Sequence, residues 1–365
     1  MGRIAVAIAG VGNCASSLLQ GLARHRADAA DATPIGLMHP VLGGYRVADV
    51  DVVCAFDVDT RKVGQRLDVA AFAPPNAVRP LCAALPPSDV VVEMGPVLDG
   101  VAAHMAAYPE ARAFRVADAP PVDVAAALRR SGAEVLVSYL PVGSQRATEH
   151  YARACLEAGV ALVNCIPAFI ASTPAWAAAF AERRIPLVGD DVKSQVGATI
   201  LHRVLAQLFV DRGVVLDRTY QLNVGGNTDF LNMLARDRTD AKRVSKTEAV
   251  QSVLPSPLPT AQVHIGPSDW VPWLGDNKVC FLRMEGRGFG DAPIEVEVRL
   301  SVQDSPNSAG CVIDAIRCCR VARDRGVGGP LLSASAYLMK HPPEQRADDR
   351  ARDDVERFLR GELER

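Results

Sequence analysis

The sequence carries almost no net charge. Its formal charge is −2 over 365 residues and it has no sustained basic block, which argues against a nucleic-acid-binding protein or a protein of the membrane surface. No apolar run is as long as a transmembrane helix. The composition, 49% hydrophobic and 22% charged, is that of an ordinary soluble globular protein of about two domains.

Cysteine and histidine patterns typical of metal sites or disulfide frameworks are missing. The nine cysteines include no C-x-x-C pair, and the seven histidines show no zinc-binding spacing. This usage indicates a reducing compartment. The first residues resemble a signal peptide, but Gly10, Gly12 and Asn13 interrupt the apolar run and favour a strand and a turn. We therefore expect a cytoplasmic protein.

A glycine motif lies between a short apolar strand, predicted at 4–8, and a segment with helical spacing. Gly10, Gly12 and Ala15 fit the pattern G-x-G-x-x-A. In this context the backbone can approach a pyrophosphate, and the N-terminus of the helix supplies amide donors. Asp57, the candidate ligand of the adenosine ribose, comes late, 45 positions after Gly12. The motif predicts a dinucleotide site, and a tight turn without a nucleotide is the alternative.

Apolar strands recur through the first half of the chain, with helical stretches between them. They are predicted at 50–59, 133–142, 160–169 and 184–192. This alternation predicts a parallel, doubly wound sheet with helices on both faces. Ligands of such sheets bind at the carboxyl ends of the strands, so the polar residues at these ends are candidate site residues.

The sequence changes in character after an amphipathic helix that ends at Gly213. From about residue 219 to 300 the strands alternate polar and apolar residues, which predicts an antiparallel sheet with one solvated or interfacial face. From residue 308 the pattern is helical again, and the charged helix at the C-terminus is expected to be solvated. We therefore expect an α/β fold: a doubly wound, Rossmann-like domain with a second, α+β unit.

Lysine is rare in this chain, with six lysines against 34 arginines. Lys242 and Lys246 lie four positions apart in a predicted helix, so two like charges share one face. A lysine is a compact point charge with an adjustable pKa, which arginine is not. Asp190 and Asp191 end one predicted strand, and Asp304 follows another. Such a cluster can hold a phosphate, shift the pKa of a lysine or carry a metal, and structural salt bridges are the alternative.

Longer motifs follow one another along the chain in a defined order: GVGNCASSL, FDVD, YLPVGS, GDDVKSQVGAT, LNVGGNTDFLNM, KRVSKTEAV, IGPSDWVPWLGDNKV, DSPNSAG and GGPLLSASAYLMK. In this order and at nearly this spacing, the chain resembles the short, actinobacterial myo-inositol-1-phosphate synthases over about residues 3–346. The resemblance implies NAD-dependent conversion of glucose 6-phosphate to an inositol monophosphate in a homotetramer. It also implies an NAD-binding domain at 1–195, an inserted catalytic and tetramerisation domain at 196–305, and helices at 306–365 that return to the first domain.

The resemblance implies roles for individual residues as well. Those expected to be catalytic are Lys242, Lys246, Lys278, Lys340, Asp191 and Asp304. The residues expected to bind NAD are Gly10, Gly12, Asn13, Cys14, Asp57, Ser138 and Asp190. Those expected to bind the sugar phosphate are Ser194, Gly225, Gly226 and Asn227. Lys278 and Lys242 would serve proton transfer and the enolate, and Lys246 and Lys340 the phosphate and the aldol oxygen. A divalent or monovalent cation would bind oxygen ligands such as Asp190, Asp191 and Asp304.

The chain departs from the motifs of its bacterial relatives at Met94, Thr228 and Gln303, and in the segment 273–278. These changes leave the substrate open. With fructose 6-phosphate, attack of carbon 6 on the carbon 2 ketone would close a five-membered carbocycle of the kind found in carbocyclic nucleosides, using the same lysines. A non-cyclising dehydrogenase or an NAD-binding regulatory protein is the alternative from another class. The intact lysine set argues against the regulatory protein.

Overall fold

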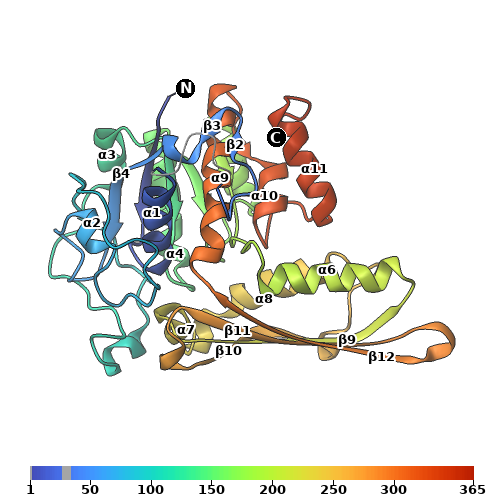
Figure 1. Cartoon of the computed structure of the whole chain (residues 1–365). Helices are drawn as coiled ribbons and strands as arrows, with labels where there is room; N and C mark the ends of the chain where they lie inside the picture. Colours follow the sequence, from blue (N-terminus) through green and yellow to red (C-terminus); the bar gives the residue numbers. More distant parts are fainter. Residues whose placement is uncertain (1, 27–33) are drawn as a thin grey trace.

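The computed structural model describes residues 2–26 and 34–365, apart from the side chains of 267 and 268. Within these residues the chain builds two large sheets, one of seven strands and one of four (Figure 1). The seven-stranded sheet contains β1 (Ile4–Ala9), β4 (Val50–Asp57), β5 (Glu93–Met94), β6 (Val135–Ser138), β7 (Ala161–Asn164), β8 (Pro186–Val188) and β13 (Gly329–Pro330). Among the described helices, none combines the length and apolar character needed to cross a bilayer.

All neighbours in the seven-stranded sheet run parallel, in the order β13-β8-β7-β6-β1-β4-β5. The order reverses at β1, which has β4 on one side and β6 on the other. In doubly wound sheets such a reversal opens a crevice at the carboxyl ends of the strands. The predicted parallel α/β fold is therefore confirmed, and its crevice lies where the glycine motif follows β1.

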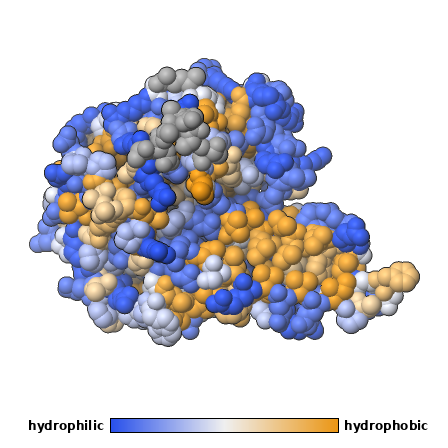
Figure 2. Space-filling view, in the orientation of Figure 1, coloured by the Kyte–Doolittle hydropathy of each residue, from blue (hydrophilic) through white to orange (hydrophobic). Residues whose placement is uncertain are grey.

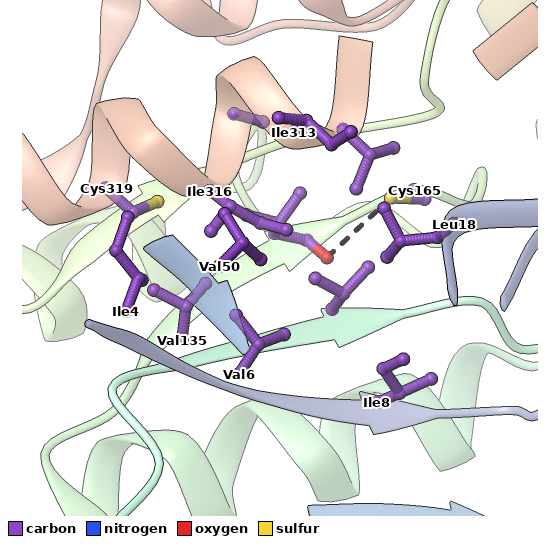
Figure 3. Packing of buried hydrophobic residues seen from close by; sticks show 14 of the residues in the cluster. Ile4, Val6, Ile8, Leu18, Val50, Val135, Cys165, Ile313, Ile316 and Cys319 are labelled. Carbon is purple, nitrogen blue, oxygen red and sulfur yellow. Dashed lines mark hydrogen bonds between the residues drawn. The ribbon is translucent and has the colours of Figure 1, made fainter. Parts of the chain in front are cut away.

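Helices cover both faces of this sheet because its strands are apolar on both sides. Ile4, Val6 and Ile8 pack toward α1 (Asn13–Arg26) and α9 (Pro306–Asp324), as Figure 3 shows for α9. Ala7 and Ala9, which alternate with them, pack toward the opposite face. The helices on that face are α3 (Val124–Ser131), α4 (Gln145–Ala158) and α5 (Pro174–Glu182).

The C-terminal helices α10 (Leu332–Leu338) and α11 (Asp348–Leu359) complete the α9 side of the sheet. The prediction of a merely solvated terminal helix is wrong at its first turn. Asp348 pairs there with the buried Lys193 at 3.1 Å and the buried Arg203 at 2.7 Å. The remaining short elements are β2 (Val41–Leu42), β3 (Tyr45–Arg46) and α2 (Leu67–Ala70).

The four-stranded sheet has the order β10-β9-β11-β12. Its strands are β9 (Val215–Gly225), β10 (Val263–Trp270), β11 (Asn277–Arg287) and β12 (Pro293–Gln303). The prediction of an antiparallel sheet is wrong for one pair, since β10 runs parallel to β9. A parallel neighbour requires a crossover, which α7 (Thr228–Asn232) and α8 (Asp240–Gln251) provide. With α6 (Ala198–Asp211), α8 lies between this sheet and the rest of the molecule (Figure 1).

Candidate active site

A cavity lies between the two units, at the carboxyl ends of the parallel strands. One side of the cavity is formed by the loops after β1, β6 and β7. The other side is formed by α6, α7, α8, the start of β11 and the residues just after β12. Its charged lining residues are Lys242, Lys246, Lys278, Lys340, Asp191, Asp229 and Asp304. Four lysines of a chain that has only six thus face one cavity.

Asp191 links two of these lysines. The Nζ atoms of Lys242 and Lys340 lie 2.8 and 3.0 Å from its Oδ1 atom, and Ser245 Oγ donates to Oδ2 at 2.7 Å. Burial alone would raise the pKa of Asp191, but the two ammonium groups hold it well below its usual range. Asp191 is therefore a fixed negative charge at neutral pH.

Lys242 and Lys246 are one turn apart on α8 and point to the same side, as their spacing predicts. Burial disfavours the charged form of Lys242, yet Asp191 and Asp229 outweigh that cost and raise its pKa. Within the part of the chain that the structure describes, no hydrogen-bond or ion-pair partner is found for the ammonium group of Lys246. The positive charge of Lys242 is thus compensated by a contacting carboxylate, whereas the ammonium group of Lys246 has no contacting carboxylate among the described residues.

Lys246 and Lys340 both have pKa values below the ordinary value of a lysine. Burial, followed by repulsion from Lys242, Lys278 and Lys340, lowers the pKa of Lys246 to about 7. Burial lowers the pKa of Lys340 to about 8, with Asp191 acting in the opposite direction. An anion bound beside them would favour their protonated forms and raise both pKa values, so anion binding in this cavity is coupled to proton uptake.

Lys278 and Asp304 form the second ion pair of the cavity, in direct contact. Lys278 is near the start of β11, and Asp304 follows β12, its antiparallel neighbour. Burial would raise the pKa of Asp304, but Lys278 and the other lysines bring it below its usual range. Asp276 supports the pair, because its carbonyl accepts from Asp304 N at 2.9 Å and its carboxylate from Ser305 N at 3.0 Å.

The glycine motif has the geometry of a dinucleotide-binding turn. Gly10 adopts φ +94°, and a Cβ there would lie 2.8 Å from the carbonyl oxygen of Tyr139, so only glycine fits. Gly12, Asn13 and Cys14 line the cavity at the N-terminus of α1. These features fit a pyrophosphate, which needs a close backbone approach and free amide donors at a helix N-terminus.

A second, mostly apolar pocket continues from the glycine motif and shares Gly12, Tyr139 and Leu140 with the main cavity. Phe56, Val58, Pro96, Val97 and Tyr151 are among its other lining residues. Asp57 lies at its edge, where its Oδ2 atom accepts from Val11 N at 2.7 Å and Oδ1 accepts from Val58 N and Asp59 N, both at 2.8 Å. A flat apolar base with its ribose toward Asp57 would fit this pocket.

Several residues predicted at the site do not line the cavity. The carboxylate of Asp190 is fully buried and accepts from the backbone amides of Ile170, Ala171 and Ser172, which holds that loop in place. Ser138 is fully buried at the end of β6. Both predictions followed from position at a strand end, which does not reveal whether a side chain points into the crevice.

The glycines of the GGN loop also act through packing. A Cβ on Gly225 would lie 2.4 Å from the ring of Phe230, and one on Gly226 would lie 2.5 Å from Gly275 N. Asn227 does line the cavity, but its side chain caps α7 and donates to Asp276 at 3.0 Å. Ser194 lines the cavity as predicted.

Sequence reasoning missed three contributions to the site. Ser245 lies between the two lysines of α8 and binds Asp191, and Asp229 of the GGNTDF motif lines the cavity, where burial raises its pKa. The N-terminus of α6, residues 197–200, also lines the cavity, with positive dipole end and free amides. The i+3 spacing of Ser245 from Lys242 was a visible signal for the first of these.

The departures from the motifs of bacterial relatives are mostly away from the cavity. Thr228 lines it, whereas Met94 is buried in β5 and Gln303 is exposed at the end of β12. As for metals, the described residues contain no cluster of three or more histidine, cysteine or acidic side chains that could hold an ion. A cation at this site stays a prediction.

Comparisons with known proteins agree with this architecture. A family model described as myo-inositol-1-phosphate synthase matches residues 197–305. The chain is 56% identical to the inositol-3-phosphate synthase of Mycolicibacterium smegmatis, covering 99% of both proteins, and 55% identical to that of Mycobacterium tuberculosis, covering 98% of this chain and 96% of that one. The crystal structure of Ari2 is 36% identical, covers 98% of this chain and 99% of its own, and has a TM-score of 0.76. Identity at this level over the whole length shows that the chain belongs to the myo-inositol-1-phosphate synthase family.

Proposed function

We propose that the protein is an NAD-dependent isomerase that converts glucose 6-phosphate to inositol 3-phosphate. The observation that carries the proposal is the meeting of four lysines and three aspartates in one cavity beside a dinucleotide-type glycine turn. The named function of relatives that are more than half identical supports the same reaction. Oxidation, enolisation, aldol closure and reduction all need charge stabilisation in one place, and the cavity provides it.

NAD would be held by the glycine motif, together with the apolar pocket and the cavity that this motif joins. Gly10, Gly12 and the N-terminus of α1 would hold the pyrophosphate, and Asp57 would hold the ribose. When bound, NAD takes a hydride from carbon 5 of the sugar and returns it to the ring ketone. The chain itself has to position the sugar and to supply and remove its protons.

The phosphate of the substrate would bind at the N-terminus of α6. Ser194 and the first residues of α6 offer neutral donors there, and Lys246 and Lys340 offer the charges. A dianionic phosphate would favour the charged forms of these two lysines, whose pKa values are lowered to about 7 and about 8 in the free protein, so its binding would be accompanied by proton uptake. Attraction to the phosphate would offset the repulsion among the lysines of the cavity.

Lys242 and Lys278 would act on the reacting carbon chain. Each contacts a carboxylate, Asp191 or Asp304, which holds its ammonium group in place. A protonated lysine can donate to the oxygen on which charge develops when a proton leaves carbon 6, and this preorganised donor lowers the barrier. The contact between Lys278 and Asp304 joins an acid to a base, a pair suited to carrying protons between sugar oxygens.

The test is incubation of the purified protein with NAD and, separately, glucose 6-phosphate or fructose 6-phosphate. The product would be identified by mass and by NMR of its ring protons. We expect an inositol phosphate from glucose 6-phosphate without accumulation of reduced cofactor. A cyclopentane from fructose 6-phosphate, or net formation of NADH, would overturn the proposal in favour of the corresponding alternative.

We also infer that the enzyme is a cytoplasmic homotetramer assembled through the four-stranded unit. Val204 and Leu208 are 52% and 50% exposed on α6, where Figure 2 shows hydrophobic side chains gathered over α6 and the adjoining sheet. An apolar surface of this kind is typical of a subunit interface. All nine cysteines are free thiols, seven of them buried, which suits a reducing compartment.

A further inference from the structure

Lys62 contacts the backbone of the glycine motif but does not line the cavity or the apolar pocket. It lies in the turn after β4, its side chain is 1% exposed, and its Nζ atom donates to the carbonyl oxygen of Val11 at 2.5 Å. Asp57, five positions earlier, accepts from the N–H of the same Val11 at 2.7 Å. The last residue of β4 and the turn that follows it therefore hold both the N–H and the carbonyl of Val11.

This double contact determines the direction of the next amide. In a trans peptide the C=O and the N–H point in opposite directions. Because Lys62 holds the Val11 carbonyl, the N–H of Gly12 is directed away from Lys62. Gly12 lines both the main cavity and the apolar pocket, and a Cβ on it would meet no atom within 4 Å. The N–H of Gly12 can therefore donate to a ligand bound in the cavity or the apolar pocket that Gly12 lines.

The charge of Lys62 is not neutralised by an ion pair with any described carboxylate. The two nearest in sequence are engaged elsewhere, since Asp57 accepts backbone amides and Asp59 pairs with Arg61 at 2.5 Å. A buried ammonium group without a counter-ion is costly, and a nearby anion reduces that cost. Lys62 therefore contributes a positive potential near the glycine motif as well as a hydrogen bond.

We propose that Lys62 is a positioning residue for the pyrophosphate of the cofactor. It acts through the Val11–Gly12 peptide, which it orients and polarises, and through its charge. The inference rests on the proposed NAD-dependent function and adds to it a residue outside both pockets that tunes affinity for the diphosphate part of the ligand. Adenosine has no phosphate, so its affinity for the protein should not depend on Lys62.

The experiment compares wild type with Lys62→Met, which keeps the length of the side chain and removes the ammonium group. Dissociation constants for NAD, ADP and adenosine are measured by calorimetry or ligand-observed NMR, together with the thermal unfolding midpoint. Lys193→Met is the matched control, because Lys193 is also 1% exposed but bonds to Asp348 and the carbonyl of Ala336, away from the glycine motif. Lys62→Gln, which keeps a neutral donor, is the second variant if Lys62→Met folds poorly.

We expect the Kd values for NAD and ADP to rise about 10- to 100-fold in Lys62→Met, the usual effect of losing a charge-assisted interaction, with adenosine binding within about twofold of wild type. Lys193→Met should leave all three constants unchanged. Equal losses for adenosine and NAD would overturn the inference, since they would indicate collapse of the loop. Unchanged NAD affinity in Lys62→Met would also overturn it, whereas a wild-type protein that binds no NAD would overturn the proposed function itself.

Discussion

At the scale of single residues, the cavity separates its lysines into two kinds. Lys242 and Lys278 each contact a carboxylate, whereas Lys246 has none in contact within the described chain. Lys340 shares Asp191 with Lys242 and still has a lowered pKa. Lys242, Lys246 and Lys340, chemically identical side chains, thus differ in the ease with which they lose a proton, which is what a reaction with several proton transfers requires.

Lys278→Ala should abolish cyclisation and leave NAD binding largely intact. The variant removes the cation in contact with Asp304, so a loss of about 10²- to 10³-fold or more in turnover is expected from the lost stabilisation of the enolate. Product formation from glucose 6-phosphate and the Kd for NAD are measured in parallel. Asn277→Ala is the control, since the neighbouring Asn277 side chain is half-buried and bonds to Ser301. Appreciable cyclisation by Lys278→Ala would remove this lysine from the catalytic set.

Binding of a sugar phosphate should take up protons near pH 8. The pKa of Lys246 is about 7 in the free protein, so this lysine is mostly neutral at pH 8 and regains its proton when a dianion binds. Below pH 7 it is already charged, and its share of the uptake disappears. Calorimetry in two buffers of different ionisation enthalpy, with a sugar-alcohol 6-phosphate that cannot cyclise, should give about 1.5 protons per site at pH 8: about one from Lys246 and about half from Lys340, whose pKa is about 8.

Lys246→Met should remove most of this uptake, and Arg243→Met should not, because Arg243 lies on the same helix but is 66% exposed. If wild type takes up no protons at pH 8, Lys246 stays neutral beside the ligand. It would then be a proton acceptor and not a phosphate ligand.

At the scale of elements, the strands, the helices and the parallel direction of the larger sheet followed from local patterns, whereas one strand pairing in the smaller sheet did not. The strand at 4–8, the glycine turn and the helix with Lys242 and Lys246 were all visible in apolar spacing. The parallel pairing of β9 with β10 could not be seen in the apolar spacing, because a crossover through α7 and α8 brings together strands that are distant in sequence. The direction of the Asp190 carboxylate could not be read from the sequence for a related reason: its motif marks a strand end, and the loop at 170–172 decides where the carboxylate points.

The turn between β9 and α7 should be intolerant of any side chain at Gly226. A Cβ there would lie 2.5 Å from Gly275 N and 2.6 Å from Val271 O, both backbone atoms that cannot move aside alone. Gly226→Ala should therefore lower the free energy of unfolding by about 1–3 kcal/mol, a typical cost of overpacking. It should also reduce kcat by displacing Asn227 and the Asp276 that it contacts.

Urea unfolding and steady-state kinetics test this prediction, with Gly21→Ala as the control. Gly21 is inside α1, and a Cβ there would meet nothing within 4 Å. That substitution should be neutral or stabilise the protein by up to about 1 kcal/mol through helix propensity. A Gly226→Ala protein as stable and active as wild type would show that the turn relaxes freely.

At the scale of the whole molecule, the cavity exists only because two units meet. The parallel sheet contributes the glycine turn and Asp191, and the four-stranded unit contributes Lys242, Lys246 and Lys278. The α6 helix joins these parts, since its N-terminus lines the cavity while its apolar side chains Val204 and Leu208 are exposed. Packing of a second subunit on α6 would therefore also fix the place where the phosphate is proposed to bind.

Leu208→Asp should disrupt the proposed tetramer and weaken substrate binding together. A carboxylate placed in an apolar interface is desolvated without a partner, which costs several kcal/mol and favours smaller species. Sedimentation velocity should show that shift, and the KM for glucose 6-phosphate should rise because α6 is no longer held in place. Val69→Asp is the control, since Val69 is 53% exposed on α2, far along the chain from α6. An oligomeric state identical to wild type in Leu208→Asp would exclude this face of α6 from the interface, and a wild-type monomer with full activity would show that one chain forms the complete site.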